Sequence, residues 1–170
     1  MAQRLRLQHY SYRFAEQVLN SRLDIKNEAL AILTDPSIDL ASLSRPNFNA
    51  LLRERFIDHG WEDQPPVFDQ ADEAAARLDF LKDRVGVEVA FGHASFLGMD
   101  LLKFQVASYS ALNKIDLGLY VVTTRAFQRT MKKHYQQNWV GSLTFEKVAT
   151  YLPHFKSAIQ VPIFVCGIDA

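Results

Sequence analysis

Residues 78–91 read LDFLKDRVGVEVAF, and this stretch decides the fold because two apolar runs flank a short charged turn. In the second run, valines at every other position share one face of a strand, while Gly86, Glu88 and Ala90 share the other. The turn brings the first run back alongside as the partner strand of a hairpin. We therefore expect Asp79 to lie next to Glu88, with Glu88 on the face turned away from the core.

Two neighbouring carboxylates predict a cation between them. Such a pair repels by several kcal/mol at intermediate dielectric, and folded proteins usually tolerate it only around a positive ion. Hard oxygen ligands with open coordination positions suit Mg²⁺. Asp79 and Glu88 are therefore candidate metal ligands. The simpler alternative is an exposed Glu88 on an edge strand, because the spacing of these two acids is common by itself.

A longer string favours the metal interpretation. Residues 78–121 read LDFLKDRVGVEVAFGHASFLGMDLLKFQVASYSALNKIDLGLYV. This string resembles the BglII/BstYI group of type II restriction endonucleases, and its BstYI branch most closely, within the PD-(D/E)XK nuclease superfamily. The resemblance continues from His9-Tyr10-Ser11 near the N-terminus to residues 162–168 (PIFVCGI), so it covers nearly the whole chain.

The order of apolar segments predicts a mixed α/β sheet, and the resemblance implies a restriction-endonuclease-like fold with a central mixed sheet flanked by helices. The length and the 48% hydrophobic content suit one domain over residues 1–170. The expected strands are 78–81, 84–91, 114–123 and 161–168. The expected helices are 25–33 with Asp24 as its cap, one from Ser44 to Gly60 with Leu51, Leu52, Phe56 and Ile57 inward, a mostly buried 96–112, 125–133 and 144–152.

The resemblance implies hydrolysis of DNA with Mg²⁺ held by Asp79, Glu88 and the backbone carbonyl of Val89. It also offers Gln64 as a residue that supports the metal site, although an ordinary polar loop is the favoured alternative at that position. Ala90 stands where the family carries Gln or another polar residue that helps to position or activate the attacking water. A methyl group has no lone pair, so cleavage is expected to be impaired.

Three explanations for Ala90 remain open: natural loss of cleavage, an engineered substitution that traps uncut DNA, or a site in which metal-bound hydroxide suffices. The engineered substitution is favoured because the rest of the site is retained. As a structural alternative, Ala90 simply fills a tight place in the sheet.

Two segments are candidate DNA contacts. His93 and Ser95 follow the second hairpin strand, where the resemblance implies base recognition, and both side chains can donate and accept hydrogen bonds. Residues 123–134 (TTRAFQRTMKKH) contain no acid. Their basic residues, Arg125, Arg129, Lys132, Lys133 and His134, are expected to contact phosphates or, at the end of the segment, bases. A solvated helix face is the alternative.

The resemblance also implies partners. Members of this group act as two-fold homodimers on palindromes, with one strand cut by each subunit. The chain is similar to enzymes that read GATC-centred sites, so double-stranded DNA containing such a palindrome is the leading target. A cognate DNA methyltransferase is expected in the same system. The helix at 96–112 or the N-terminal helix with Glu28 is expected to form the dimer interface, and core packing is the alternative.

Composition limits the class of protein less than the motif does. Lys plus Arg and Asp plus Glu both number 19, so a DNA-binding surface must come from local segregation of charge. The single cysteine, Cys166, excludes an intramolecular disulfide and favours a buried position and a reducing cytoplasm. The sequence shows neither an export signal nor a membrane-spanning run, so no membrane association is expected.

Two other functions remain open from the sequence. A catalytically inactive relative would keep the fold and bind specific DNA without cutting it. A DNA-repair nuclease would recognise structure and bind without a preference for palindromes, although the end-to-end resemblance argues against it.

Overall fold

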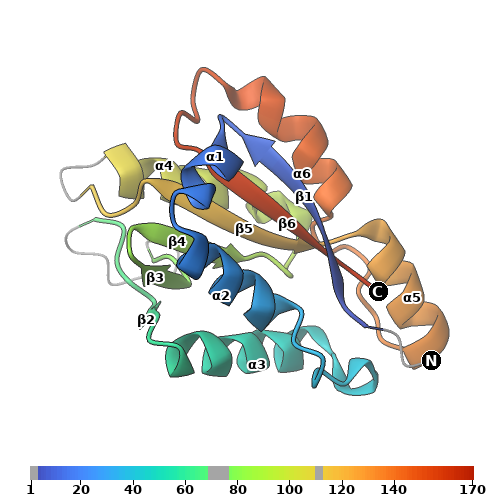
Figure 1. Cartoon of the computed structure of the whole chain (residues 1–170). Helices are drawn as coiled ribbons and strands as arrows, with labels where there is room; N and C mark the ends of the chain where they lie inside the picture. The colour runs from blue at the N-terminus through green and yellow to red at the C-terminus, as the bar shows by residue number, and fades with distance from the viewer. Residues whose placement is uncertain (1–3, 69–76, 110–112) are drawn as a thin grey trace.

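The computed structural model describes residues 4–68, 77–109 and 113–170, which form an α/β fold around one six-stranded sheet (Figure 1). The strand order is β1-β6-β5-β4-β3-β2. The central pairs β4–β5 and β5–β6 are parallel and the outer pairs are antiparallel, which confirms the expected mixed sheet. The strands are Arg6–Tyr12 (β1), Glu62–Asp63 (β2), Phe80–Lys82 (β3), Val85–Val89 (β4), Leu117–Thr123 (β5) and Ile163–Asp169 (β6).

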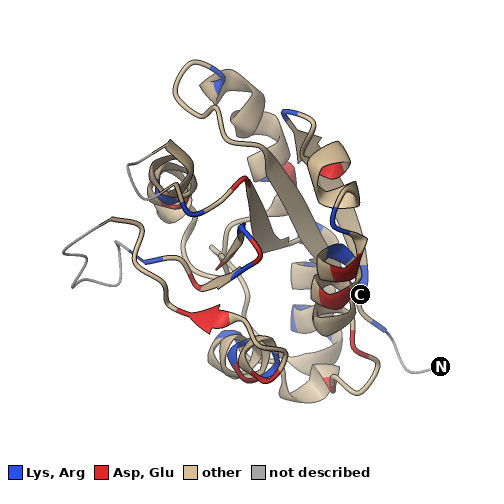
Figure 2. Cartoon of the chain, turned by 60° about the vertical axis from the view of Figure 1, so that its left-hand side comes forward, with Lys and Arg blue, Asp and Glu red and all other residues tan. Residues whose placement is uncertain are grey.

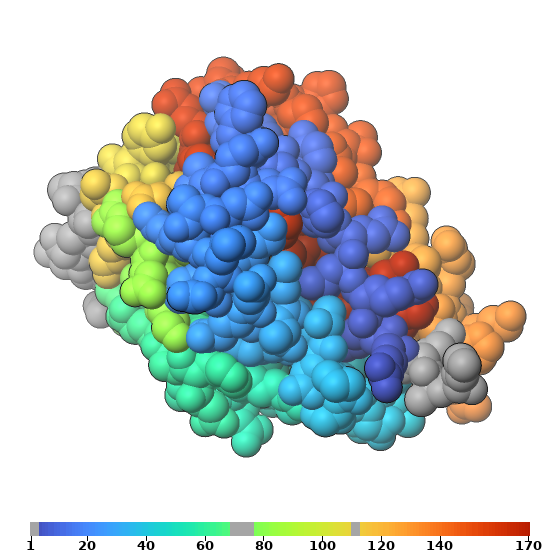
Figure 3. Space-filling view, viewed as in Figure 1, coloured from blue at the N-terminus to red at the C-terminus, as the bar shows by residue number. Residues whose placement is uncertain are grey.

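Helices cover both faces of this sheet. One hydrophobic cluster joins α1, α2, α3 and α5 to the first face, and a second cluster joins α4 and α6 to the other. In the view of Figures 1 and 3, α2 and α3 close over the near face. The helices are Ala15–Asn20 (α1), Leu23–Leu33 (α2), Arg45–Asp58 (α3), Leu97–Tyr109 (α4), Arg125–Tyr135 (α5) and Phe145–Tyr151 (α6).

The central strands are buried on both faces, as parallel strands between two helical layers must be. Every residue of β5 and β6 is buried. Along β5, Leu119 and Val121 enter the first cluster, whereas Tyr120 and Val122 enter the second. Cys166 is fully buried in β6, as its apolar surroundings predict.

Helix ends follow the predicted chemistry in part. Ser44 caps α3 by accepting a hydrogen bond from the Asn47 N–H, and Gly60 follows the helix at φ +80°. The cap expected at Asp24 is wrong, because α2 begins one residue earlier and Asp24 lies in its first turn. The expected inward face of α3 is partly wrong as well, since Ile57 is 42% exposed.

The expected burial of the helix at 96–112 is correct for one side only. The described helix, α4, buries Leu97, Leu101 and Phe104 against the sheet. Its other side exposes Met99 and Leu102, each about half exposed at 48% and 49%. Residues 110–112 of the expected helix lie outside the described residues.

The sequence analysis missed β1, which pairs antiparallel with β6 and places His9 opposite Cys166. This edge strand is partly exposed along most of its length, so it has no apolar alternation to detect. The expected strands were found with shorter bounds: β3 and β5 begin two and three residues later than predicted.

Candidate active site

The predicted hairpin is present, and it holds Asp79 against the strand that carries Glu88. β3 and β4 pair antiparallel with Phe80 opposite Val87. The Asp79 N–H donates to the Val87 carbonyl at 3.1 Å, and the Val89 N–H donates to Asp79 Oδ2 at 2.7 Å. Asp79 is therefore bonded to both sequence neighbours of Glu88, which brings the two acidic residues to one place.

Glu88 lies inside the protein, and the expected non-core face is wrong. Its side chain is buried, with the residue 3% exposed, because α4 packs over this face and forms the second core there. The edge-strand alternative is also wrong, since β4 lies between β3 and β5. A buried acid in a central strand requires a partner, which makes a functional role for Glu88 more plausible than the sequence alone did.

Lys103 of α4 is the partner of Glu88. Its Nζ donates to Glu88 Oε2 at 2.8 Å and to the Arg77 carbonyl at 3.2 Å, and it lies 3.5 Å from Asp100 Oδ1. Asp100 in turn accepts a hydrogen bond of 2.7 Å from the Tyr120 hydroxyl. We call Asp79, Glu88, Asp100 and Lys103 the acidic cluster.

Burial and mutual repulsion shift the pKa values of these acids upward. Burial, and then the charge of Asp79, raises the pKa of Glu88 to about 9. Burial also raises the pKa values of Asp79 and Asp100. Burial alone would lower the pKa of Lys103, but the neighbouring acids, Glu88 first, raise it overall. Three acids around one base favour the entry of a further positive charge.

The donor atoms suit a hard divalent cation. Glu88 Oε1 is buried and has no hydrogen-bond partner among the described residues. Val89 directs its N–H toward Asp79, and the carbonyl of a strand residue points to the same side as its N–H. Within residues 4–68, 77–109 and 113–170, no group of three or more His, Cys, Asp or Glu side chains is placed to hold a metal. Mg²⁺ needs only one or two carboxylates, because waters and substrate phosphates complete its shell.

Ala90 follows β4 directly. Its N–H donates to the Val121 carbonyl at 2.8 Å, and its side chain packs against the hydrophobic cluster beneath α4. Ala90 therefore shares the face of Glu88, as predicted, and it adds no polar atom there.

A cavity of about 360 Å³ opens beside Asp79 and is lined by residues of α3, β2 and the hairpin, among them Asn49, Arg53 and Gln64. The Gln64 N–H donates to the Asp79 carbonyl at 2.9 Å, so the predicted supporting residue lies beside the site. Arg53 pairs with Asp63 at 2.6 Å, and Figure 2 shows the acidic strand β2 in red next to α3.

His93 and Ser95 are exposed where the chain leaves β4. The Ser95 N–H donates to His93 Nδ1 at 3.1 Å, and the Ser95 hydroxyl lies 2.9 Å from the same nitrogen. A bridge between His93 and Ser142 ties this turn to the segment that follows α5. These two predicted DNA contacts therefore lie at the carboxyl edge of the parallel strands, just after the strand that carries Glu88.

The basic segment forms α5, which begins at the same edge. Thr124 directly follows β5 and caps the helix by accepting a hydrogen bond from the Phe127 N–H. Phe127 and Met131 are buried and fix the outward face. The five predicted DNA contacts on this helix are all exposed, and none forms a salt bridge with another described residue: Arg125, Arg129, Lys132, Lys133 and His134.

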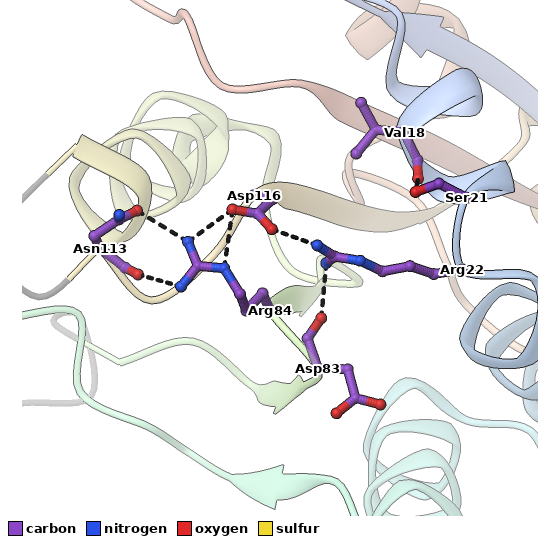
Figure 4. Close-up of polar contacts among 7 residues, drawn as sticks. All are labelled: Val18, Ser21, Arg22, Asp83, Arg84, Asn113 and Asp116. Atoms are coloured by element: carbon purple, nitrogen blue, oxygen red, sulfur yellow. Dashed lines mark hydrogen bonds and ion pairs between the residues drawn. The ribbon is translucent and has the colours of Figure 1, made fainter.

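A second group of charged residues lies at the turn of the hairpin. Arg84 Nη2 lies 2.7 Å from Asp116 Oδ1, and Arg22 pairs with the other oxygen of Asp116 (Figure 4). Arg84 also donates to the Asn113 carbonyl, while Arg22 donates to the Asp83 carbonyl. Arg84 thus braces the turn of the hairpin through Asp116. We call Arg22, Arg84 and Asp116 the brace.

The sequence analysis missed Asp100, Lys103 and Tyr120. A signal was present, because Asp100 and Lys103 are three residues apart on the side of a helix that is otherwise apolar. Two charges on a buried helical face indicate either mutual pairing or a functional site.

Across the described part of the chain, no helix is both long enough and apolar enough to cross a membrane.

Comparisons with known proteins agree with this fold. The family model described as "Restriction endonuclease BglII/BglIII" matches residues 7–168. A crystal structure of restriction endonuclease BglII complexed with a DNA 16-mer is similar to the chain with a TM-score of 0.74 and 17% sequence identity, over 97% of this chain and 77% of that one. A crystal structure of free BglII gives a TM-score of 0.60 and 17% identity, over 95% and 78%. A search of curated proteins found no match.

Proposed function

Because the chain belongs to the BglII/BglIII family of restriction endonucleases, we propose that it is a type II site-specific deoxyribonuclease that depends on Mg²⁺ and acts on a palindrome containing GATC. The observation that carries this proposal is the meeting of Asp79 with Glu88, whose Oε1 is buried without a partner among the described residues. Such an oxygen is costly unless a cation or a proton reaches it.

Asp79, Glu88 and the Val89 carbonyl would hold the metal ion. When bound, Mg²⁺ polarises the scissile phosphate and lowers the pKa of a water that attacks it. The chain's own residues prepare this site: the Val89 N–H fixes one oxygen of Asp79, and Lys103 fixes one oxygen of Glu88. The remaining oxygen of each carboxylate is left for the ion.

The DNA would cross the carboxyl edge of the parallel strands. His93 and Ser95 would approach bases in the major groove, while the exposed cations of α5 would contact phosphates. Base contacts and phosphate contacts would then share the edge of the sheet at which β4 and β5 end. The family resemblance and the absence of salt bridges to these cations among the described residues support it.

We propose a homodimer of single-domain subunits, since two-fold symmetry lets one chain cut each strand of a palindrome. The exposed side of α4 is the proposed interface, and a second copy of this chain is its occupant. Its large apolar side chains Met99, Leu102 and Tyr109 recur at helical spacing, and with Phe96 of the preceding turn they are 48–62% exposed. In this setting the enzyme would act in the cytoplasm beside a cognate DNA methyltransferase.

A catalytically inactive DNA-binding relative is the second candidate, and Ala90 favours it because position 90 contributes no lone pair. Loss of one general acid-base participant typically costs ~10²–10⁴-fold in rate. The two candidates share DNA binding and separate at cleavage.

The deciding experiment is a plasmid-cutting assay with Mg²⁺ together with binding to GATC-containing and scrambled duplexes. We expect the parent chain to cut slowly in Mg²⁺, because position 90 carries no polar side chain, and to prefer the palindrome when Ca²⁺ replaces Mg²⁺ in the binding buffer. Binding without cutting under all conditions would favour the inactive relative, and equal binding to both duplexes would contradict the proposed specificity.

The phosphate contacts are tested by the dependence of binding on salt. Changing Lys132 and Lys133 to Ala should reduce the slope of log K against log[salt] by about 1 for each phosphate that is no longer neutralised. Lys156→Ala is the matched control, because Lys156 is exposed and precedes β6 at the opposite edge of the sheet. An unchanged slope in the Lys132/Lys133 variant would remove this part of α5 from the interface.

A further inference from the structure

The face of β4 that bears Glu88 lacks a polar side chain at position 90, but it does not lack a polar group. Residues two apart on a strand point to the same side, so Glu88 and Ala90 both face α4. Lys103 extends from α4 into this space and reaches Glu88 Oε2 at 2.8 Å. The helix therefore brings an ammonium group to the face where the strand brings only a methyl group.

Lys103 is held in place from several directions. Its side chain is only 11% exposed, and its Nζ also contacts the Arg77 carbonyl and Asp100. Asp100 is itself fixed by the buried hydroxyl of Tyr120. The ammonium donates hydrogen bonds to Glu88 and to the Arg77 carbonyl and pairs with Asp100 at 3.5 Å, so it has little freedom to leave the site, which is the property required of a group that orients reactants.

The charges of the acidic cluster indicate that Lys103 works with a cation and does not replace it. With all groups ionised, Asp79, Glu88 and Asp100 carry three negative charges and Lys103 carries one positive charge. A single divalent ion balances the remaining two. Lys103 occupies only Oε2 of Glu88 and leaves Oε1 without a partner among the described residues, so the lysine and an ion can share this carboxylate.

We propose that Lys103 is the third polar side chain of the cleavage site and supplies from α4 what Ala90 cannot supply from β4. This inference rests on the proposed nuclease function. The ammonium fixes Glu88 and offers an N–H to the attacking water and to the charge that develops on the phosphate. The water oxygen bonds to phosphorus and gives up a proton to solvent, while the bond to the leaving sugar oxygen breaks and that oxygen takes a proton from solvent. Lys103 keeps its own proton throughout.

A purely structural ion pair between Lys103 and Glu88 is the competing explanation. Moving the lysine from α4 to the end of β4 distinguishes the two explanations. The variants are Lys103→Met and the double change Lys103→Met with Ala90→Lys, which returns an ammonium from the strand. Lys114→Met is the matched control, because Lys114 is a partly buried lysine that donates to the Pro66 carbonyl away from the acids. Melting temperature, DNA affinity in Ca²⁺ and Mg²⁺ affinity by calorimetry are measured beside single-turnover cleavage.

We expect the parent chain to cut and Lys103→Met to cut ~10²–10⁴-fold more slowly at saturating DNA and Mg²⁺. DNA affinity in Ca²⁺ should stay within about twofold of the parent value, and Mg²⁺ should still bind, because Asp79 and Glu88 remain. Adding Ala90→Lys should recover about tenfold or more of the missing rate, which a merely structural role for Lys103 does not explain. Lys114→Met should cut like the parent chain.

Parent-like cutting by Lys103→Met overturns the inference, as does a loss of rate that follows melting temperature alone and is not recovered by Ala90→Lys. A parent chain that binds DNA and Mg²⁺ but cuts only after Ala90→Lys also overturns it, while the DNA-binding part of the proposed function stands. If the parent chain neither cuts nor prefers the palindrome, the proposed function fails together with the inference. Unimpaired cutting by Glu88→Gln would show instead that the site itself is misplaced.

Discussion

The acidic cluster and the brace are two charged groups built around the same hairpin, and their charges are balanced in opposite ways. The cluster has three acids and one base in the interior, whereas the brace has two arginines around Asp116 near the surface. Hydrogen bonding to Arg84 lowers the pKa of Asp116 to about 2, while burial raises that of Glu88 to about 9. Two carboxyl groups beside the same hairpin therefore have pKa values that are shifted in opposite directions.

The difference shows which group is complete. Both oxygens of Asp116 are paired with an arginine, so the brace is satisfied by the chain alone. In the acidic cluster one oxygen of Glu88 has no partner in the described structure, and the acids exceed the bases. A protein that retains such a buried imbalance gives up stability at a place where binding a cation can restore it.

The largest effect that would test this contrast is on cleavage. Glu88→Gln and Asp79→Asn keep the shape of the site but remove a charged metal ligand, so cleavage should fall by ~10³-fold or more, equivalent to several kcal/mol of transition-state stabilisation. Mg²⁺ binding measured by calorimetry should weaken in parallel. Arg22→Met in the brace is the control and should cut at nearly the parent rate. Equal losses in all three variants would mean that the two charged groups do not differ in function.

The brace should matter for stability instead. Asp116→Asn removes the charge that both arginines share and leaves them close together, which should cost about 1–2 kcal/mol in the free energy of unfolding after allowance for partial exposure. Urea denaturation of the metal-free protein measures this loss. Cleavage per folded molecule should be retained, and a strong drop in that quantity would assign the brace a part in catalysis.

The sequence predicted the hairpin and both of its acids because the information is local. Alternating valines, a charged turn and the spacing of Asp79 and Glu88 all lie within 14 residues, and the observed pairing of Phe80 with Val87 follows from them. The family resemblance extended this local pattern to the mixed sheet, which the structure confirms.

What the sequence could not predict depends on contacts between distant segments. The burial of Glu88 and its bond to Lys103 require α4 to pack across β4, and the pairing of Arg22 with Asp116 joins residues 94 positions apart. The edge strand β1 escaped detection because exposure on both sides hides its periodicity. Local patterns thus located the acids, whereas only the packed structure showed how each charge is balanced.

Removing the charged carboxyl group should destabilise the brace, but at the acidic cluster the same kind of change should stabilise the metal-free protein. Glu88→Gln replaces a buried acid, whose ionisation burial opposes, with a neutral side chain of similar shape, so the metal-free protein should gain about 1–2 kcal/mol at pH 8. The gain should disappear when Mg²⁺ is added, because only the parent chain is then stabilised by the ion. Thermal or urea denaturation with and without Mg²⁺ provides both values. A loss of stability in metal-free buffer would show that Lys103 already satisfies Glu88.

The smallest expected effect is on the pH dependence of stability, and it should have opposite signs at Glu88 and Asp116. The pKa of Glu88 is raised in the folded state, so its contribution is fully present below its ordinary value of 4.5 and is lost as pH rises toward about 9. The pKa of Asp116 is lowered, so its contribution is present above its ordinary value of 3.8 and is lost as pH falls toward about 2. Solvent screening limits the Asp116 contribution to about 1 kcal/mol.

In metal-free protein, the gain in unfolding free energy of Glu88→Gln over the parent should therefore grow between pH 5 and pH 9. The loss in unfolding free energy of Asp116→Asn should instead shrink below about pH 4. Urea denaturation of both variants across this range gives the difference in unfolding free energy from the parent at each pH. If that difference changes with pH in the same direction for both variants, the proposed imbalance of charge at Glu88 is contradicted.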